Sequence, residues 1–151
     1  MDPVMQIAEQ VDLAFKGEAW HGPSLLEALD GVDADLASRR LIPQAHSIWE
    51  IVLHAMAWKI AIRRRLGGEA IELPPDQDWP SASDTTDEAW RATLNQLHDA
   101  HEALMRAVTT LSPERLDAIV PGKDYTAAFM MLGMPQHDAY HAGQIAILKK
   151  R

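Results

Sequence analysis

Apolar side chains recur at intervals of three and four residues along most of this 151-residue chain. That spacing places them on one face of an α-helix, so each run predicts an amphipathic helix. The long helices are expected at about residues 3–15, 47–66, 86–111 and 124–150. A polar, proline-rich connection of about residues 67–84 separates the second from the third. Four long helices with one long crossover predict an all-α four-helix bundle.

Polar residues that satisfy free backbone amides mark several of the helix starts. Ser47 with Glu50, and Thr85 with Glu88, both have the capping-box spacing, in which each side chain serves an amide of the other residue. Pro23 suits the first turn of a short additional helix that Gly31 ends. These signals support the predicted helix boundaries.

The composition limits the classes of protein to which the chain can belong. Its length and 47% apolar content predict a single folded domain, residues 1–151. Acidic residues outnumber basic ones by 22 to 14, which argues against a nucleic-acid partner. No apolar run approaches the ~20 residues of a membrane span, and the start lacks the pattern of a signal peptide. With no cysteine for disulfides, a cytoplasmic location is expected.

Two histidines four residues apart, His137 and His141, lie in the last predicted helix. They project from one helical face, where two imidazoles can bind one transition-metal ion, although the same spacing also arises by chance. Asp138 follows the first histidine where zinc proteases carry a glutamate, which disfavours a protease. A di-iron site is rejected, because Glu18 and His21 form the chain's lone E-x-x-H motif.

A third ligand must come from another helix and cannot be a cysteine. His54 lies on the buried face of the second long helix, and His101 lies on the apolar face of the third. A histidine on such a face is more often a core residue with hydrogen-bonded ring nitrogens than a ligand. The spacing therefore leaves both candidates open. Glu50 has two possible roles, orienting His54 or only capping its helix.

Three blocks of the sequence resemble the DinB-like family, also described as YfiT-like metal-dependent enzymes, and the resemblance covers nearly the whole chain. They are Trp20-His21-Gly22-Pro23-Ser24-Leu25, His46-Ser47-Ile48-Trp49-Glu50 with His54, and His137-x-x-Tyr140-His141-Ala142-Gly143-Gln144-Ile145. The resemblance implies an up-down-down-up bundle that binds zinc or nickel through three histidines. By motif these are His54, His137 and His141, which favours His54 over His101.

The family also includes transferases that act with low-molecular-weight thiols, so the resemblance implies a metal-dependent transferase or hydrolase. Three protein ligands leave an open coordination position, as in catalytic zinc sites. The alternative is a non-catalytic bundle that the metal holds together, or a partner-binding module. Tyr140 and Gln144 are either substrate contacts or core residues. The resemblance and the five tryptophans together predict a homodimer. A small-molecule substrate is expected from the resemblance.

Overall fold

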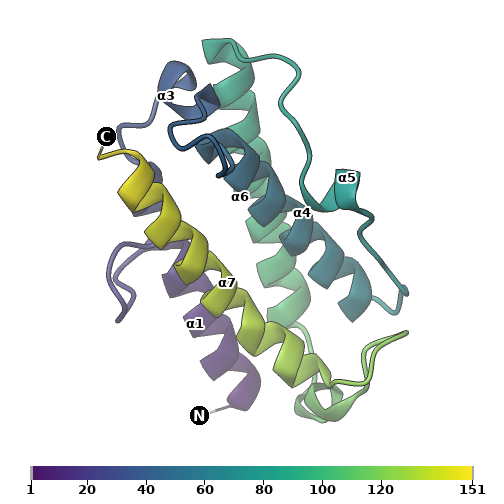
Figure 1. The fold of residues 1–151 in the computed structure, drawn as a ribbon. Coiled ribbons are helices and arrows are strands. Elements are labelled where there is room, and N and C mark those ends of the chain that lie inside the picture. Colours follow the sequence, from purple (N-terminus) through teal and green to yellow (C-terminus); the bar gives the residue numbers. More distant parts are fainter. Residues whose placement is uncertain (1, 151) are drawn as a thin grey trace.

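Four long helices form the body of the protein. The computed structural model describes residues 2–150, with α1 at Pro3–Lys16, α4 at Ile48–Leu66, α6 at Asp87–Thr109 and α7 at Ala127–Leu148. In Figure 1, α1 and α7 run upward and α4 and α6 run downward. The predicted all-α bundle with up-down-down-up topology is therefore confirmed.

Short helical elements fill the connections. Helices α2 (Leu25–Leu29) and α3 (Ala34–Ser38) lie between α1 and α4, and the 3-10 helix η1 (Pro113–Asp117) lies between α6 and α7. The long connection contains α5 (Pro75–Asp78) and runs back along the side of the bundle to the start of α6 (Figure 1). Helix α5 contacts α4, so this connection packs against the helix that it follows.

One of the two predicted capping boxes is present in the structure. The Ser47 hydroxyl accepts the Glu50 amide at 3.1 Å, and the Glu50 carboxylate accepts the Ser47 amide at 3.5 Å. The box predicted at Thr85 is wrong by one residue, since Thr86 is the N-cap and accepts the amide of Ala89. The cause is local: Asp84 accepts the Thr86 amide at 3.0 Å, and this turn brings Thr86 to the helix start.

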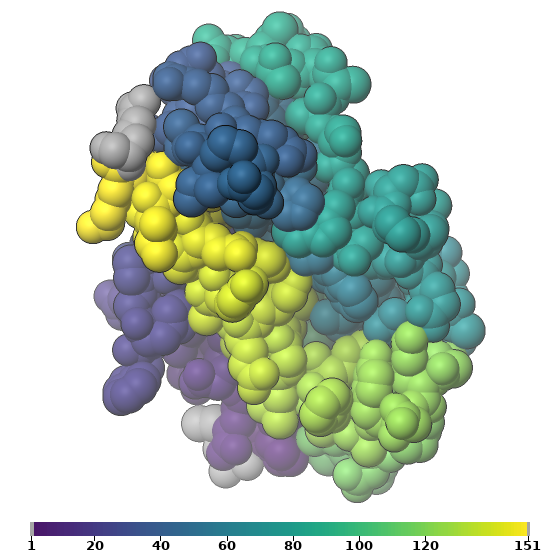
Figure 2. Space-filling model, viewed as in Figure 1, coloured from purple at the N-terminus to yellow at the C-terminus, as the bar shows by residue number. Residues whose placement is uncertain are grey.

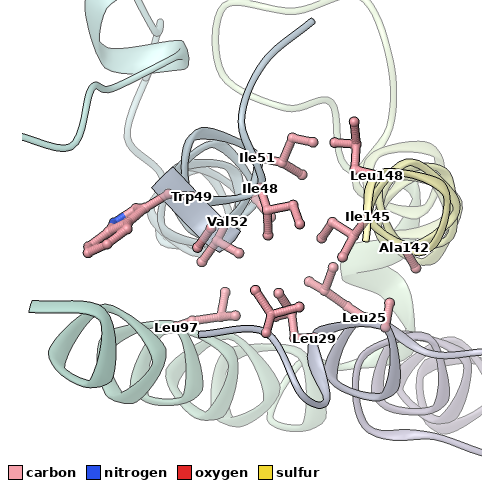
Figure 3. Close-up of a cluster of buried hydrophobic side chains, with 14 of the residues drawn as sticks. Leu25, Leu29, Ile48, Trp49, Ile51, Val52, Leu97, Ala142, Ile145 and Leu148 are labelled. Carbon is pink, nitrogen blue, oxygen red and sulfur yellow. The ribbon is translucent and has the colours of Figure 1, made fainter. Parts of the chain in front are cut away.

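The core consists of two apolar clusters at the two ends of the bundle. Figure 3 shows the first, in which Ile48 and Val52 of α4, Ile145 and Leu148 of α7, and Leu25 of α2 converge. The second cluster joins the N-terminal half of α1 to the last turn of α4, the end of α6 and the start of α7. Between them lies a layer of buried polar side chains: His54, Lys59, His101, Asp138 and His141. Burial of these groups is costly unless each has a polar partner.

Helices that could cross a lipid bilayer do not occur among residues 2–150, since none is both long and apolar enough. Figure 2 shows the face on which α7 (yellow) lies beside the connection that carries α5 (teal) and the segment that leads into α7 (green).

Candidate metal centre

Three imidazoles converge between α4 and α7. The Nε2 atom of His137 lies 3.0 Å from Nε2 of His54 and 3.2 Å from Nε2 of His141. One ligand atom from each residue lies within 4.8 Å of the others. His54 and His141 are buried, and His137 is half-buried. The structure thus brings together the three histidines that the resemblance implied.

The second ring nitrogen of each buried imidazole determines where its proton lies. Nδ1 of His54 is 2.7 Å from the backbone carbonyl oxygen of Asp78, and a carbonyl only accepts, so this nitrogen carries the hydrogen. Nδ1 of His141 is 2.7 Å from the Gln144 Oε1 atom and likewise donates. The Nε2 atoms of His54 and His141 are therefore unprotonated and present lone pairs to the same point.

That arrangement fits a bound cation. Two Nε2 lone pairs flank His137, and one N–H on His137 Nε2 satisfies only one of them. The opposite nitrogen of that ring, Nδ1, is buried and has no hydrogen-bond partner. A metal ion that accepts all three Nε2 lone pairs removes the repulsion among them, and neutral imidazole nitrogens suit such an ion.

Burial keeps all three rings neutral. Desolvation lowers the pKa of His54 and that of His141 below their usual value. The pKa of His137 falls to about 3, first because the ring is desolvated and then because His141, His54 and Lys59 are nearby. Neutral imidazole is the form that binds metal, so the environment favours ligation over protonation.

The long connection closes over His54. The Trp79 ring stacks on the His54 ring at 3.7 Å between centroids and on the His46 ring, also at 3.7 Å. The Asp78 carboxylate accepts the indole N–H of Trp58 at 2.7 Å, which anchors this turn to α4. Trp79 thus lies at the site. The part played by Asp78 was missed, because a connection without a repeating pattern does not reveal where its residues face.

The other residues singled out from the sequence differ in how they relate to the cluster. The Glu50 carboxylate contacts His46 and Arg40, each at 2.9 Å, and caps α4, so capping is the one of its two considered roles that the structure shows. Gln144 contacts the imidazole of His141, whereas Tyr140 is 65% exposed with its ring beside that of His141.

His101, the rival third ligand, belongs to a separate polar group. Its Nδ1 lies 3.3 Å from the Lys59 ammonium, its Nε2 lies 2.9 Å from Asp12, and its ring stacks on Phe15. Lys59 also donates to the Asp138 carboxylate at 2.7 Å, and both of those side chains are completely buried. This group joins side chains of α1, α4, α6 and α7 in the interior of the bundle.

A cavity of about 420 Å³ opens beside the imidazoles and runs between α4 and the start of α7. His54 and His137 lie at one end, Arg65 and Tyr125 line it further along, and its walls are mainly apolar, with Trp58, Ile62, Met130 and Met134 among them. The volume falls within the ~300–1,000 Å³ typical of small-molecule sites.

The chain matches one family model. The family model described as the DinB superfamily matches residues 19–145, a range that includes all three histidines of the cluster. No curated protein and no solved structure matches the chain.

Proposed function

Because the chain belongs to the DinB superfamily, we propose that His54, His137 and His141 together bind one divalent transition-metal ion. The observation that carries the proposal is the convergence of three Nε2 atoms, two of them unprotonated because their Nδ1 atoms donate to Asp78 and Gln144. Imidazole nitrogens without thiolates suit zinc or nickel, and one of these two is the proposed metal.

We further propose that the protein is a metal-dependent enzyme, a transferase that uses a low-molecular-weight thiol or a hydrolase. A divalent metal supplies Lewis acidity, which lowers the pKa of a thiol or of a water molecule. Three protein ligands leave room for such a group. The adjoining cavity supports this proposal over the non-catalytic alternative, because a metal that only held the helices together would need no cavity.

The chain's own residues prepare the site in this proposal. The Asp78 carbonyl and the Gln144 side chain hold two imidazoles in the tautomer that ligation requires. Trp79 covers one face of His54 and reduces access of water to it. The apolar cavity walls provide a binding space of low polarity, in which a polar substrate group is less well solvated.

The test is metal titration of variants that have been stripped and reloaded, with elemental analysis of the product. His54→Ala, His137→Ala and His141→Ala are each expected to bind zinc or nickel much more weakly than the wild type, because each loses one of three ligands. Affinity is also expected to fall on acidification, since protons compete for the same nitrogens. Wild-type affinity in His54→Ala would refute the three-histidine site.

The matched controls replace histidines outside the cluster. His21→Ala and His98→Ala, both at exposed positions, and His101→Ala are expected to bind one equivalent as the wild type does. Loss of binding in His101→Ala, with retention in His54→Ala, would assign the third ligand to α6. Incubation of the metal-loaded protein with several thiols and electrophiles then tests the transferase, and ester or amide substrates test the hydrolase.

A further inference from the structure

One cation in the cavity wall lacks an anionic partner. Arg65 is only 3% exposed, yet it lines the cavity. Its Nε and Nη2 atoms donate to the carbonyl oxygen of Ile71 at 3.0 and 2.7 Å, and Nη1 donates to the Tyr125 hydroxyl at 3.2 Å. Both acceptors are uncharged. A guanidinium has five N–H groups and stays protonated in proteins, so these contacts occupy three of them and neutralise none of the charge.

The acidic side chains that follow α4 have other partners. Glu69 forms a bidentate ion pair with Arg64. Glu72 is largely exposed and bonds to Lys123, which lowers the pKa of Glu72 more than the charge of Arg65 does. Among residues 2–150, no carboxylate forms an ion pair with Arg65. Burying an unpaired charge is unfavourable, which makes the position suited to an anion supplied from outside.

The location of Arg65 relates it to the imidazole cluster. His54, Trp58, Ile62 and Arg65 lie at intervals of four, four and three along α4, and therefore on one face, and all four line the cavity. His54 and Arg65 are eleven positions apart on α4, which corresponds to a rise of roughly 16 Å between their Cα atoms. Both residues line the same cavity, so a molecule with a chain of several bonds can reach from one to the other.

We propose that Arg65, with the Tyr125 hydroxyl, binds a carboxylate group of the substrate or of the thiol, whose other end lies at the three-histidine cluster. The planar guanidinium matches the two oxygens of a carboxylate, and an apolar surrounding strengthens the pairing. Trp58 supports the guanidinium from one side, with its ring 5.3 Å from the Arg65 Cζ atom. The proposal rests on the proposed metal-dependent function and specifies the class of molecule that the site accepts.

The experiment compares probes that differ only in their charged end. With metal-stripped protein, calorimetry measures the binding of hexanoate and of 1-hexanol. With zinc-loaded protein, it measures 6-mercaptohexanoate and 6-mercapto-1-hexanol, in which the thiol tests the metal. In both states the wild type is expected to prefer the carboxylate by about tenfold or more, as for other hydrogen bonds to charged groups. This comparison needs no variant, and equal binding of acid and alcohol would overturn the proposal.

Variants then assign the preference to a residue. Arg65→Met is expected to lose the preference while it still binds 6-mercapto-1-hexanol, and Arg65→Lys to retain only part of it because the fork is lost. Arg64→Met, which removes a neighbouring exposed cation, is the matched control and should behave as the wild type. Unchanged preference in a folded Arg65→Met protein would contradict the assignment and leave Arg65 only the role of holding the Ile71 carbonyl.

The two arms separate this inference from the proposed function. If hexanoate binds through Arg65 but a thiol adds no affinity in the presence of zinc, the thiol-dependent form of the proposed function fails and the carboxylate site stands. If 6-mercapto-1-hexanol binds to the zinc-loaded protein as tightly as 6-mercaptohexanoate, and more tightly than 1-hexanol, the carboxylate site fails and the thiol-dependent function stands. Repeating the measurement with carboxylate-bearing thiols and with carboxylate-bearing electrophiles distinguishes which reactant carries the anion.

Discussion

The Nδ1 atom of His54 donates to the backbone carbonyl of Asp78 at 2.7 Å, across 24 positions of the chain. The connection that carries Asp78 therefore sets the tautomer of an imidazole on α4, and Trp79 stacks on the same ring. A substitution cannot remove a backbone acceptor. The equivalent contact on α7 is made by a side chain, Gln144, and it provides the accessible test of how much such orientation contributes.

Gln144→Leu is expected to weaken zinc binding by about 10- to 100-fold, because an acceptor that orients a ligand histidine commonly contributes that much. The variant keeps a similar volume and leaves all three imidazoles in place. Metal affinity is measured by competition with a chromogenic chelator. Gln136→Leu, at an exposed position of the same helix, is the control and should match the wild type. Equal affinities of the two variants would mean that Gln144 does not orient His141.

His101 is expected to contribute to loss of stability in acid. Its pKa falls from 6.5 to about 4, because the ring is desolvated and lies beside the positive charge of Lys59, with a smaller effect from Lys16. The hydrogen bond and the negative charge of Asp12 raise the pKa and offset part of this shift. The unfolded chain then binds more protons than the folded one between those two values. The contribution is fully present above about pH 6.5 and is lost as the pH falls towards about 4.

Urea denaturation of the metal-stripped protein from pH 7 to 4 measures this effect. His101→Gln keeps one donor and one acceptor but does not titrate, so its loss of stability over this range should be smaller by up to about 3 kcal/mol. The three clustered histidines are common to both proteins and cancel in the difference. His98→Gln, at an exposed position on the same helix, should follow the wild type. Parallel curves for His101→Gln and the wild type would contradict the prediction.

The buried pair of Lys59 and Asp138 is expected to be sensitive to removal of one partner. Lys59→Met leaves the Asp138 carboxylate buried without its cation, which should lower the free energy of unfolding by about 3–5 kcal/mol. Burial already raises the pKa of Asp138, and the Oδ1 atom of this carboxylate has no hydrogen-bond partner. Denaturant titration at pH 7 provides the measurement.

The double variant Lys59→Met/Asp138→Leu completes this cycle. It replaces the pair with apolar side chains of comparable size, and it should be more stable than Lys59→Met alone because no charge remains buried. A double variant that is less stable than the single one would mean that the pair's hydrogen bonds, including that of Lys59 to His101, outweigh the cost of burying the charges.

We also propose that the protein forms a homodimer, and the outer face of α7 is the expected contact. Phe129, Leu132, Tyr140 and Ile147 are between 46% and 68% exposed on this helix, which is unusual for large apolar side chains. Light scattering at micromolar concentrations should give twice the 16.8 kDa mass of the chain. Ile147→Glu should shift the mass towards the monomer, whereas Glu88→Gln, at an exposed position on α6, should not. A monomer mass for the wild type would refute the dimer.

Features that depend on neighbours within about four positions could be predicted from the sequence. The four long helices and the Ser47 cap follow from periodic apolar residues and local hydrogen bonds, and so does the shared face of His137 and His141. The prediction of a cap at Thr85 was wrong although it also concerned near neighbours, because Asp84 accepts the Thr86 amide and makes Thr86 the cap. Helical spacing is set by the geometry of one turn, so a single sequence contains enough information to read it.

Which side chains meet across the bundle was decided by tertiary structure. Periodicity placed both His54 and His101 on buried faces, yet packing directs His54 towards His137 of α7 and His101 towards Asp12 and Lys59. The Glu50 carboxylate contacts His46 and Arg40, and not His54. The Asp78 carbonyl contacts His54 from a connection that has no periodic pattern of apolar residues. The reason is physical: an apolar stripe determines which face of a helix is buried, but its rotation and height against each neighbour depend on how all the helices pack together.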